Sequence, residues 1–354
     1  MHLSPPIQLR NLKEMKTEFI SQNEINLSTL THAGEILRCG GLVVFPTETV
    51  YGLGANALDS TAAEKIYAAK GRPSDNPLIV HIASPDDAEK YAHIGEEYKR
   101  LSKAFMPGPL TVIMPKRNCI PSTVTGGLDS VGIRCPENKI ARDLIKAAGV
   151  PIAAPSANIS GKPSPTSAEH VKVDLDGKVD AIIDGGECTF GLESTIVKIE
   201  NGKITLLRPG AITLDMLNAL FDNVEVADAV TNKLSEDARP LSPGMKYRHY
   251  APSAPLYLLN GSDEKRIAYC SAAGEDTLLL VFDEEAELFS GHSIITIGKR
   301  GDEKSQAKRL FAALREADAT NCKKILAPMP RKSGIALALY NRMIRAAAHN
   351  IIDL

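Results

Sequence analysis

The stretch from residue 42 to residue 82 constrains the fold of this chain more than any other. An apolar run at Leu42–Phe45 is followed by a polar turn with two glycines, a helical pattern, a basic loop and a second apolar run ending at His81–Ile82. The polar turn contains Thr47, Glu48, Thr49 and Tyr51. Polar loops at strand ends, where glycine lets the backbone approach a ligand, are where α/β proteins carry out chemistry. We therefore expect this stretch to form half of an active site.

Short apolar runs alternate with helical patterns from about residue 25 to residue 221. Runs of this length, bounded by glycine, proline and polar residues, predict strands. They are Leu42–Phe45, Leu78–Ile82, Leu110–Met114, Val131–Arg134, Ile152–Ala154, Ala181–Ile183, Thr195–Ile199 and Ile204–Leu207. Thr61 and Thr166, each followed three residues later by glutamate, match the capping box that begins a helix. The pattern predicts a mixed α/β or α+β domain around a large twisted sheet.

The periodicity divides the chain into four parts. Residues 1–22 show little periodicity and are expected to form an N-terminal extension, and residues 23–223 form the first domain. Residues 224–255 contain proline-rich runs typical of a stiff linker, although residues 245–250 are too aromatic and basic for an idle tether. Residues 256–354 alternate apolar runs with helices, which predicts a small Rossmann-like three-layer α/β domain. Its expected strands are Leu256–Leu259, Leu278–Phe282, Ile294–Ile297 and Lys324–Ala327, with helices after Gly301 and from about Gly334 to Ala348.

Length and charge limit the class of protein. The 354 residues predict two domains. Residues 241–354 hold 16 Lys and Arg against 13 Asp and Glu, so residues 1–240 carry a net charge of −5 in a chain of net charge −2. This balance argues against wholesale binding of nucleic acid or membrane. No apolar run reaches the length of a signal peptide or a membrane span, and the six separated cysteines indicate reduced thiols, so we expect a cytoplasmic protein.

Glycine motifs for nucleotides are weak or missing. Gly52-x-Gly54-x-x-Ala57 matches the dinucleotide fingerprint only nominally, because six residues separate it from the strand that ends at Phe45. The chain has no P-loop motif, and no His, Asp or Glu cluster has the spacing of a zinc site. We therefore expect no organic cofactor and no dedicated metal site, and any Mg²⁺ would arrive on substrate phosphates.

Lys70 and Arg72 are the first candidate site residues. Cations at the end of a helix usually complement its dipole. Here Pro73 and Pro77 stiffen the loop that follows, and this loop leads into the strand ending in His81. Two cations held on a stiff loop suit a polyphosphate, with Arg72 able to make paired contacts and Lys70 acting as a point charge.

A second polar turn follows the run at Ile152–Ala154. It holds Ser156 and Asn158, whose hydroxyl and amide groups suit phosphate or ribose oxygens, and no nucleophile motif surrounds the serine. Arg134 ends another apolar run, which indicates either a carboxylate at the strand tip or a surface arginine on an edge strand. Polar ends on neighbouring strands would form one cleft.

These segments together resemble a known family. The motifs that carry the resemblance are, in chain order, PTETVYGLGANA, KGRPSDNPLIVHI, PGPLT, VGIRCP, AAPSANISGKPSPT, IIDGG, GLESTIV and LLRPGAI. They are similar to the YrdC-type domain, with its large twisted mixed sheet and flanking helices. With SPGMKYRHYAP and the domain after it, the chain resembles the long, two-domain form of the threonylcarbamoyl-AMP synthase family.

The resemblance implies a nucleotidyltransferase that joins L-threonine, bicarbonate and ATP into threonylcarbamoyl-AMP and diphosphate, the first step of the N6-threonylcarbamoyladenosine modification at position 37 of tRNA. The positions it implies for threonine are Thr47, His81, Arg134, Ala154 and Ser194. The positions it implies for ATP are Lys70, Ser74, Ser130, Ser156, Ser164, Arg208 and Tyr247. Lys70, Arg72, Ser156 and Asn158 are expected to act by charge and positioning, without a covalent nucleophile.

Further expectations concern partners and motion. The implied partners are the enzymes that transfer the threonylcarbamoyl group to tRNA, and stable direct binding of nucleic acid is not expected. The alternative is an RNA-binding maturation factor without chemistry of its own, which would bind RNA in a strongly salt-dependent way. We also hypothesise that the linker around Tyr247 is a lid that excludes water from the intermediate.

Overall fold

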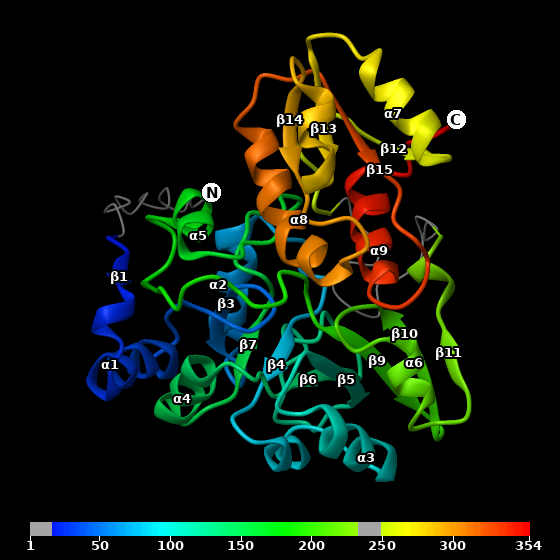
Figure 1. Cartoon of the computed structure of the whole chain (residues 1–354). Helices are drawn as coiled ribbons and strands as arrows, with labels where there is room; N and C mark the ends of the chain where they lie inside the picture. Colours follow the sequence, from blue (N-terminus) through cyan, green and yellow to red (C-terminus); the bar gives the residue numbers. More distant parts are fainter. Residues whose placement is uncertain (1–15, 233–248) are drawn as a thin grey trace, which may run out of the picture.

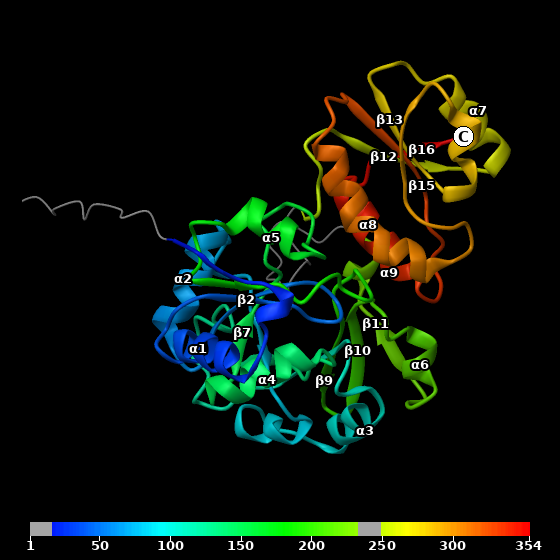
Figure 2. The same cartoon turned by 60° about the vertical axis from the view of Figure 1, so that its left-hand side comes forward.

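The computed structural model describes residues 16–232 and 249–354, which form two domains (Figures 1 and 2). We call residues 16–232 the N-terminal domain and residues 249–354 the C-terminal domain. None of the helices in these two ranges has the length and apolar character that crossing a bilayer requires.

The N-terminal domain is built on one mixed sheet of eleven strands. In spatial order the strands are β1 (Glu18–Ile20), β8 (Ala181–Ile183), β2 (Val43–Phe45), β3 (Gly52–Asn56), β7 (Ile152–Ala154), β4 (Ile79–His81), β6 (Ser130–Arg134), β5 (Leu110–Pro115), β9 (Thr195–Glu200), β10 (Lys203–Arg208) and β11 (Val224–Val226). The sheet contains both parallel and antiparallel pairs, as the pairs β4·β6 and β4·β7 illustrate. The large mixed sheet expected from the sequence is therefore confirmed.

Helices cover both faces of this sheet because its strands alternate apolar side chains between two cores. The helices are α1 (Leu27–Arg38), α2 (Ser60–Lys70), α3 (Glu96–Phe105), α4 (Lys139–Ala148), α5 (Ala168–Leu175) and α6 (Leu214–Asn218). Val44 belongs to the apolar core that includes α2, α3 and α5, whereas Val43 and Phe45 belong to the core that includes α1 and α4. On the α1–α4 face, His81 and Arg134 are partners in the β4·β6 register, so the ends of two strands meet there.

The C-terminal domain has five parallel strands with helices on both faces. The strands are β14 (Ser293–Thr296), β13 (Thr277–Val281), β15 (Lys324–Pro328), β12 (Leu256–Asn260) and β16 (Ile351–Asp353), in spatial order. The helices are α7 (Asp263–Ser271), α8 (Glu303–Asp318) and α9 (Ala336–Ala346). The three layers are confirmed, but β15 lies between the first two strands, which are neighbours in the dinucleotide-binding order.

The two domains share a packed interface, with α8 and α9 lying between the C-terminal sheet and the N-terminal domain (Figures 1 and 2). Val50 and Leu192 of the N-terminal domain belong to the apolar core built by α8 and α9. Tyr250 stacks on Phe311 of α8, with ring centroids 5.1 Å apart. Gly191 lets the backbones approach closely, because a Cβ there would lie 2.6 Å from the Cα of Lys308.

All eight strands expected before residue 221 are present, as are the four expected after residue 255. Four strands of the described residues were missed, one of which is β16 (Ile351–Asp353) in the C-terminal domain. Residues 18–20 form edge strand β1 instead of belonging to an extension, and residues 224–226 form β11 of the sheet instead of the linker. Gly52–Asn56 was expected to be a turn because of its glycines, but it forms strand β3, which pairs with β2. Gly54 has no room for a side chain there, since a Cβ would lie 2.7 Å from Ile152.

The capping boxes expected at Thr61 and Thr166 are wrong. Asp59 caps α2 by accepting from the Thr61 N–H, and Ser167 caps α5 by accepting from the His170 N–H. In both cases a preferred N-cap residue lies within two residues of the position chosen from the pattern, and its side chain accepts the hydrogen bond from the free N–H group.

We predict that Gly191→Ala destabilises the protein more than Gly149→Ala. Both glycines have positive φ, which costs an alanine about 1 kcal/mol, but a Cβ at Gly149 meets nothing within 4 Å. At Gly191 the Cβ also overlaps α8, which adds roughly 1–3 kcal/mol. Thermal unfolding of both variants tests this, and equal decreases in Tm would contradict the close interdomain contact.

Candidate active site

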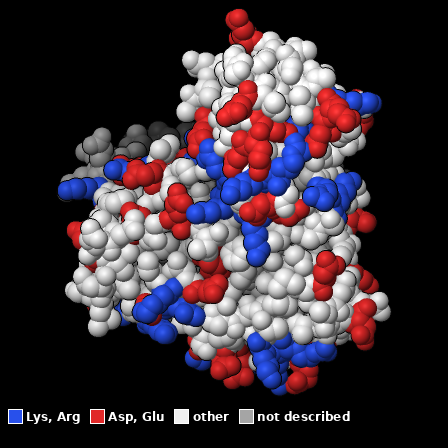
Figure 3. All heavy atoms as spheres, viewed as in Figure 1, with Lys and Arg blue, Asp and Glu red and all other residues white. Residues whose placement is uncertain are grey.

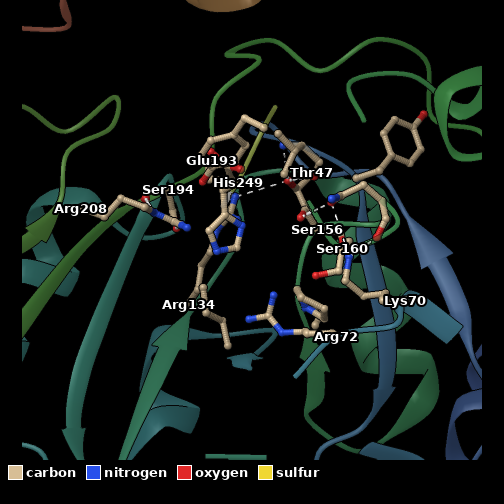
Figure 4. Close-up of a pocket in the computed structure, with 18 of the residues that line it drawn as sticks. Thr47, Lys70, Arg72, Arg134, Ser156, Ser160, Glu193, Ser194, Arg208 and His249 are labelled. Atoms are coloured by element: carbon tan, nitrogen blue, oxygen red, sulfur yellow. Dashed lines mark hydrogen bonds between the residues drawn. The ribbon is translucent and has the colours of Figure 1, made fainter. Parts of the chain in front are cut away.

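One cavity of about 680 Å³, including its open mouth, lies where the N-terminal sheet meets the segment entering the C-terminal domain (Figure 4). Its floor includes Ile79 and Ala154, which lie opposite each other in the β4·β7 pair. Residues from the loops after β2, α2 and β7 and before β9, together with Arg208 at the end of β10, contribute to the wall.

The cavity collects most of the residues expected from the sequence. Those that line it are Thr47, Lys70, Arg72, His81, Arg134, Ala154, Ser156, Asn158, Ser194 and Arg208. Three expected ATP contacts do not line it: Ser74 is exposed, Ser130 begins β6 at the end remote from Arg134, and the buried Ser164 hydroxyl donates to Glu193. Their contacts with ATP stay predictions. Tyr247 lies outside the described residues, as do all of residues 233–248 of the expected linker and lid.

Lys70 is buried at the end of α2 and is held by backbone carbonyls. Its Nζ donates to the carbonyl oxygen of Ser156 at 2.6 Å and also to that of Asn158. Burial lowers the pKa of Lys70 well below its usual value, and the positive charge of Arg72 lowers it further. The ammonium group is therefore poised for an anion that would restore its ordinary pKa.

Arg72 approaches the cavity from the loop after α2. Its Nε donates to the Asn76 carbonyl at 3.3 Å and an Nη to the Pro77 carbonyl at 3.1 Å. On the β7 side, the Ser156 hydroxyl donates to Asn158 Oδ1, and the Asn158 amide nitrogen donates to two carbonyls of its own loop. The expected Lys-x-Arg and Ser-x-Asn pairs thus face one another. The hydrogen bonds from Lys70 to the carbonyls of Ser156 and Asn158 join them.

Arg134 is tied to the turn after β2 by a buried ion pair. Its Nη2 lies 2.6 Å from Glu48 Oε1 and 3.4 Å from the Thr47 hydroxyl. The other Glu48 oxygen accepts from the backbone N–H of Glu137 at 3.1 Å. Among residues 16–232 and 249–354, no group forms a hydrogen bond with the buried Nε of Arg134. A buried donor of this kind carries a desolvation cost that a bound oxygen would relieve.

His81 is a neutral group in this wall. Its Nδ1 lies 3.0 Å from the carbonyl oxygen of Ile79, and its ring packs edge-on against Phe45. Burial and, to a smaller extent, the charge of Arg134 lower the pKa of His81 to about 3. His81 is therefore uncharged at neutral pH and adds no positive charge to the cavity.

The opposite wall is a network around Glu193 (Figure 4). Arg208 donates to the backbone oxygen of Ser194 at 3.1 Å and to its hydroxyl at 3.2 Å. Burial lowers the pKa of Arg208 to about 10, although Glu193 opposes this shift. The Glu193 carboxylate accepts from Ser164 at 2.6 Å and from Arg342 of α9 at 2.9 Å.

Sequence reasoning gave no site role to Glu193, His249 or Tyr250, which line the cavity. Glu48 was named in the polar turn without a specific role, and it fixes Arg134 from behind the wall. The aromatic and basic composition of residues 245–250 was a usable signal for His249 and Tyr250. Tyr250 has φ of 63°, an uncommon conformation for a tyrosine, which its stacking on Phe311 stabilises.

This arrangement favours electrostatic positioning over covalent catalysis. The hydroxyl of Ser156 donates to an amide and that of Ser194 bonds Thr111 and Arg208, so neither is paired with a histidine base. Within residues 16–232 and 249–354, no three His, Cys, Asp or Glu side chains gather as metal ligands. Four cations, Lys70, Arg72, Arg134 and Arg208, line the same cavity.

We predict that stability falls as the pH decreases below about 6.5. Burial lowers the pKa of both His81 and His249 to about 3, whereas unfolded histidines titrate near 6.5, so the unfolded state binds more protons between these values. Each proton adds up to about 1.4 kcal/mol per pH unit to the slope. His81→Gln and His249→Gln should each flatten the dependence of Tm on pH, and His93→Gln, which replaces an exposed histidine, is the control. Unchanged slopes in the first two variants would contradict their neutral burial.

Comparison with known proteins agrees with this geometry. The Sua5/YciO/YrdC family model, described as "Telomere recombination", matches residues 35–210. The model described as "Threonylcarbamoyl-AMP synthase, C-terminal domain" matches residues 212–348. The two matches cover both domains of the structure.

Relatives match along nearly the whole chain. A threonylcarbamoyl-AMP synthase of Pyrococcus abyssi is 44% identical, covering 90% of this chain and 94% of that protein. One of Bacillus subtilis is 42% identical, covering 95% and 97%. The crystal structure of P. abyssi Sua5 complexed with L-threonine, 42% identical, superposes with a TM-score of 0.86 over 96% of this chain and 99% of that one. The chain therefore belongs to the threonylcarbamoyl-AMP synthase family, in its two-domain form.

Proposed function

We propose that the cavity binds L-threonine, bicarbonate and MgATP and joins them into threonylcarbamoyl-AMP with release of pyrophosphate. The observation that carries this proposal is the convergence of Lys70, Arg72, Arg134 and Arg208 on one cavity. All three reactants present negative groups, and their mutual repulsion opposes their assembly. Cations held in a partly buried wall offset that repulsion more strongly than they would in water.

Threonine is assigned to the part of the cavity where β4, β6 and β7 meet the turn after β2. The residues assigned to it are Thr47, His81, Arg134, Ala154 and Ser194. Arg134 offers a buried Nε for the carboxylate, and neutral His81 adds no further charge beside the amine. A complex of P. abyssi Sua5 with L-threonine supports this part of the proposal.

ATP is assigned to the Lys70 side of the cavity. Lys70, Arg72, Ser156, Asn158 and Arg208 would contact it there, and the contacts of Ser74, Ser130, Ser164 and Tyr247 remain predictions. The Glu193 carboxylate in the wall already accepts a hydrogen bond at each oxygen. We therefore assign Mg²⁺ to the phosphate oxygens of ATP and no organic cofactor to this chain.

The reaction needs positioning more than a nucleophile from the protein. The threonine nitrogen attacks the carbon of bicarbonate, and loss of water leaves a carbamate. A carbamate oxygen then attacks the α-phosphorus of ATP, the bond to the β-phosphate oxygen breaks, and pyrophosphate leaves with its electron pair. Lys70, Arg72 and Arg208 would stabilise the charge that develops on the phosphates.

The product is a labile mixed anhydride, so we infer that a cytoplasmic tRNA-modifying system consumes it. Binding of RNA by this chain itself is not part of the proposal. On the face shown in Figure 3, basic and acidic side chains are interspersed over both domains. A surface that tracks an RNA backbone is instead dominated by Lys and Arg.

We predict pyrophosphate release that requires L-threonine, ATP and bicarbonate together, with threonylcarbamoyl-AMP detected by mass spectrometry. A site that binds the threonine hydroxyl discriminates against valine, which lacks it, by roughly a hundredfold or more in kcat/KM. Omitting bicarbonate or replacing threonine by serine or valine provides the controls. Equal turnover with valine, or turnover without any amino acid, would overturn the proposal.

We predict that Lys70→Met lowers kcat/KM for ATP by roughly a hundredfold or more, because it removes a charge directed at the phosphates. Lys65→Met is the matched control. Lys65 lies on the same helix, and its Nζ donates to the Gly40 carbonyl outside the cavity. The assay is threonine-dependent pyrophosphate release, and equal losses in the two variants would argue against the assigned role.

A further inference from the structure

Arg342 of α9 reaches from the C-terminal domain into the wall of the cavity. Its side chain is fully buried, and its Nε lies 2.9 Å from Glu193 Oε2. Its Nη2 donates to the backbone oxygen of Glu193 at 3.2 Å, and its Nη1 donates to the backbone oxygen of Pro209 at 2.7 Å. One guanidinium group thus holds three points of the N-terminal domain.

These points are next to two assigned substrate contacts. Glu193 precedes Ser194 in the chain, and Pro209 follows Arg208. Ser194 and Arg208 are themselves joined by two hydrogen bonds, of 3.1 and 3.2 Å. Arg342 therefore fixes both ends of the pair without lining the cavity itself.

The charges of Glu193, Arg342 and Arg208 indicate that the Arg342–Glu193 contact does more than attach the two domains. Glu193 is a buried carboxylate that faces two arginines, and the pKa of Glu193 falls to about 2 because Arg342 and then Arg208 outweigh the effect of burial. In the absence of Arg342, Arg208 would be the main cation left for this carboxylate. Arg208 would then be drawn toward Glu193 and away from a substrate anion.

We propose that Arg342 is a positioning residue of the active site, which neutralises Glu193 so that Arg208 and Ser194 remain directed at the substrates. The proposal rests on the assignment of ATP to Arg208 and threonine to Ser194. It makes the C-terminal domain a structural part of the active site. The simpler view is that Arg342 only attaches the domains, as Asn341 does through its hydrogen bond of 2.7 Å to Val230.

A double-mutant cycle separates these two roles. The variants are Arg342→Gln, Glu193→Gln and the combination of both, in the full-length protein. Arg345→Gln is the matched control, since Arg345 lies on the same helix and donates to the Ala229 carbonyl at 2.6 Å. Each variant is assayed for KM and kcat with ATP and with L-threonine, and its Tm is measured.

If Arg342 acts by neutralising Glu193, Arg342→Gln should lower kcat/KM for ATP by about tenfold or more, mainly through a higher KM. Removing the carboxylate as well should restore kcat/KM to within about threefold of Glu193→Gln alone. Arg345→Gln should change kcat/KM by less than about threefold. If Arg342 only attaches the domains, the double variant should not recover kcat/KM.

The proposal is overturned if the double variant is as impaired as Arg342→Gln, or if Arg345→Gln causes the same rise in KM. If Arg342→Gln does not fold, comparison of the double variant with Glu193→Gln decides, because both lack the buried carboxylate; a tenfold difference between them would refute charge neutralisation. Failure of the proposed function is recognised separately, since the wild-type protein would then release no threonine-dependent pyrophosphate.

Discussion

The repulsion among four cationic side chains around one cavity governs the rest of this structure. Lys70, Arg72, Arg134 and Arg208 line the same space, and Lys70, Arg134 and Arg208 are buried. Like charges removed from water repel strongly and lose hydration, so the surrounding groups must compensate them. Two carboxylates, Glu48 and Glu193, supply part of this compensation. The remaining positive charge is what would attract the substrate anions assigned to the cavity.

Backbone carbonyls also compensate the buried positive charges. The conformation of the loops that hold these carbonyls therefore determines the chemistry of the site. Lys70 is held by the carbonyls of Ser156 and Asn158, and Arg72 by those of Asn76 and Pro77. Carbonyl dipoles stabilise a cation without cancelling its charge. A wall built this way can therefore hold cations in place while leaving them able to attract phosphate.

Sequence reasoning was most successful where the signal is local. Apolar runs predicted twelve of the strands, and polar or charged residues at the ends of strands and helices indicated Thr47, Lys70, Arg134 and Ser156. The fold brings these four residues together. It failed where the decisive contact is distant or sterically concealed. Strand β3 was read as a turn because its glycines signal flexibility, whereas Gly54 is needed to make room for Phe45 and Ile152.

Contacts between the two domains are even harder to predict from the sequence, because their partners lie far apart in the chain. Glu193 and Arg342 are 149 residues apart, and neither forms a motif with its neighbours that reveals the pairing. Edge strands β1 and β11, of three residues each, carry too little periodicity to be distinguished from an extension or a linker. Long-range partners of buried charges become visible only when the fold brings the elements together.

Asp174, like Glu193, is a buried carboxylate of the N-terminal domain that pairs with an arginine of the C-terminal domain. Asp174 of α5 has a fully buried side chain and lies 2.7 Å from Arg315 of α8, which also donates to the Pro163 carbonyl. Asp174 accepts from the Ile159 N–H, in the loop that carries the Ser-x-Asn pair. Both walls of the cavity are thus supported by carboxylates whose arginine partners belong to the C-terminal domain. Separating the domains would leave these buried charges without those partners, so domain packing and the electrostatics of the site are one constraint.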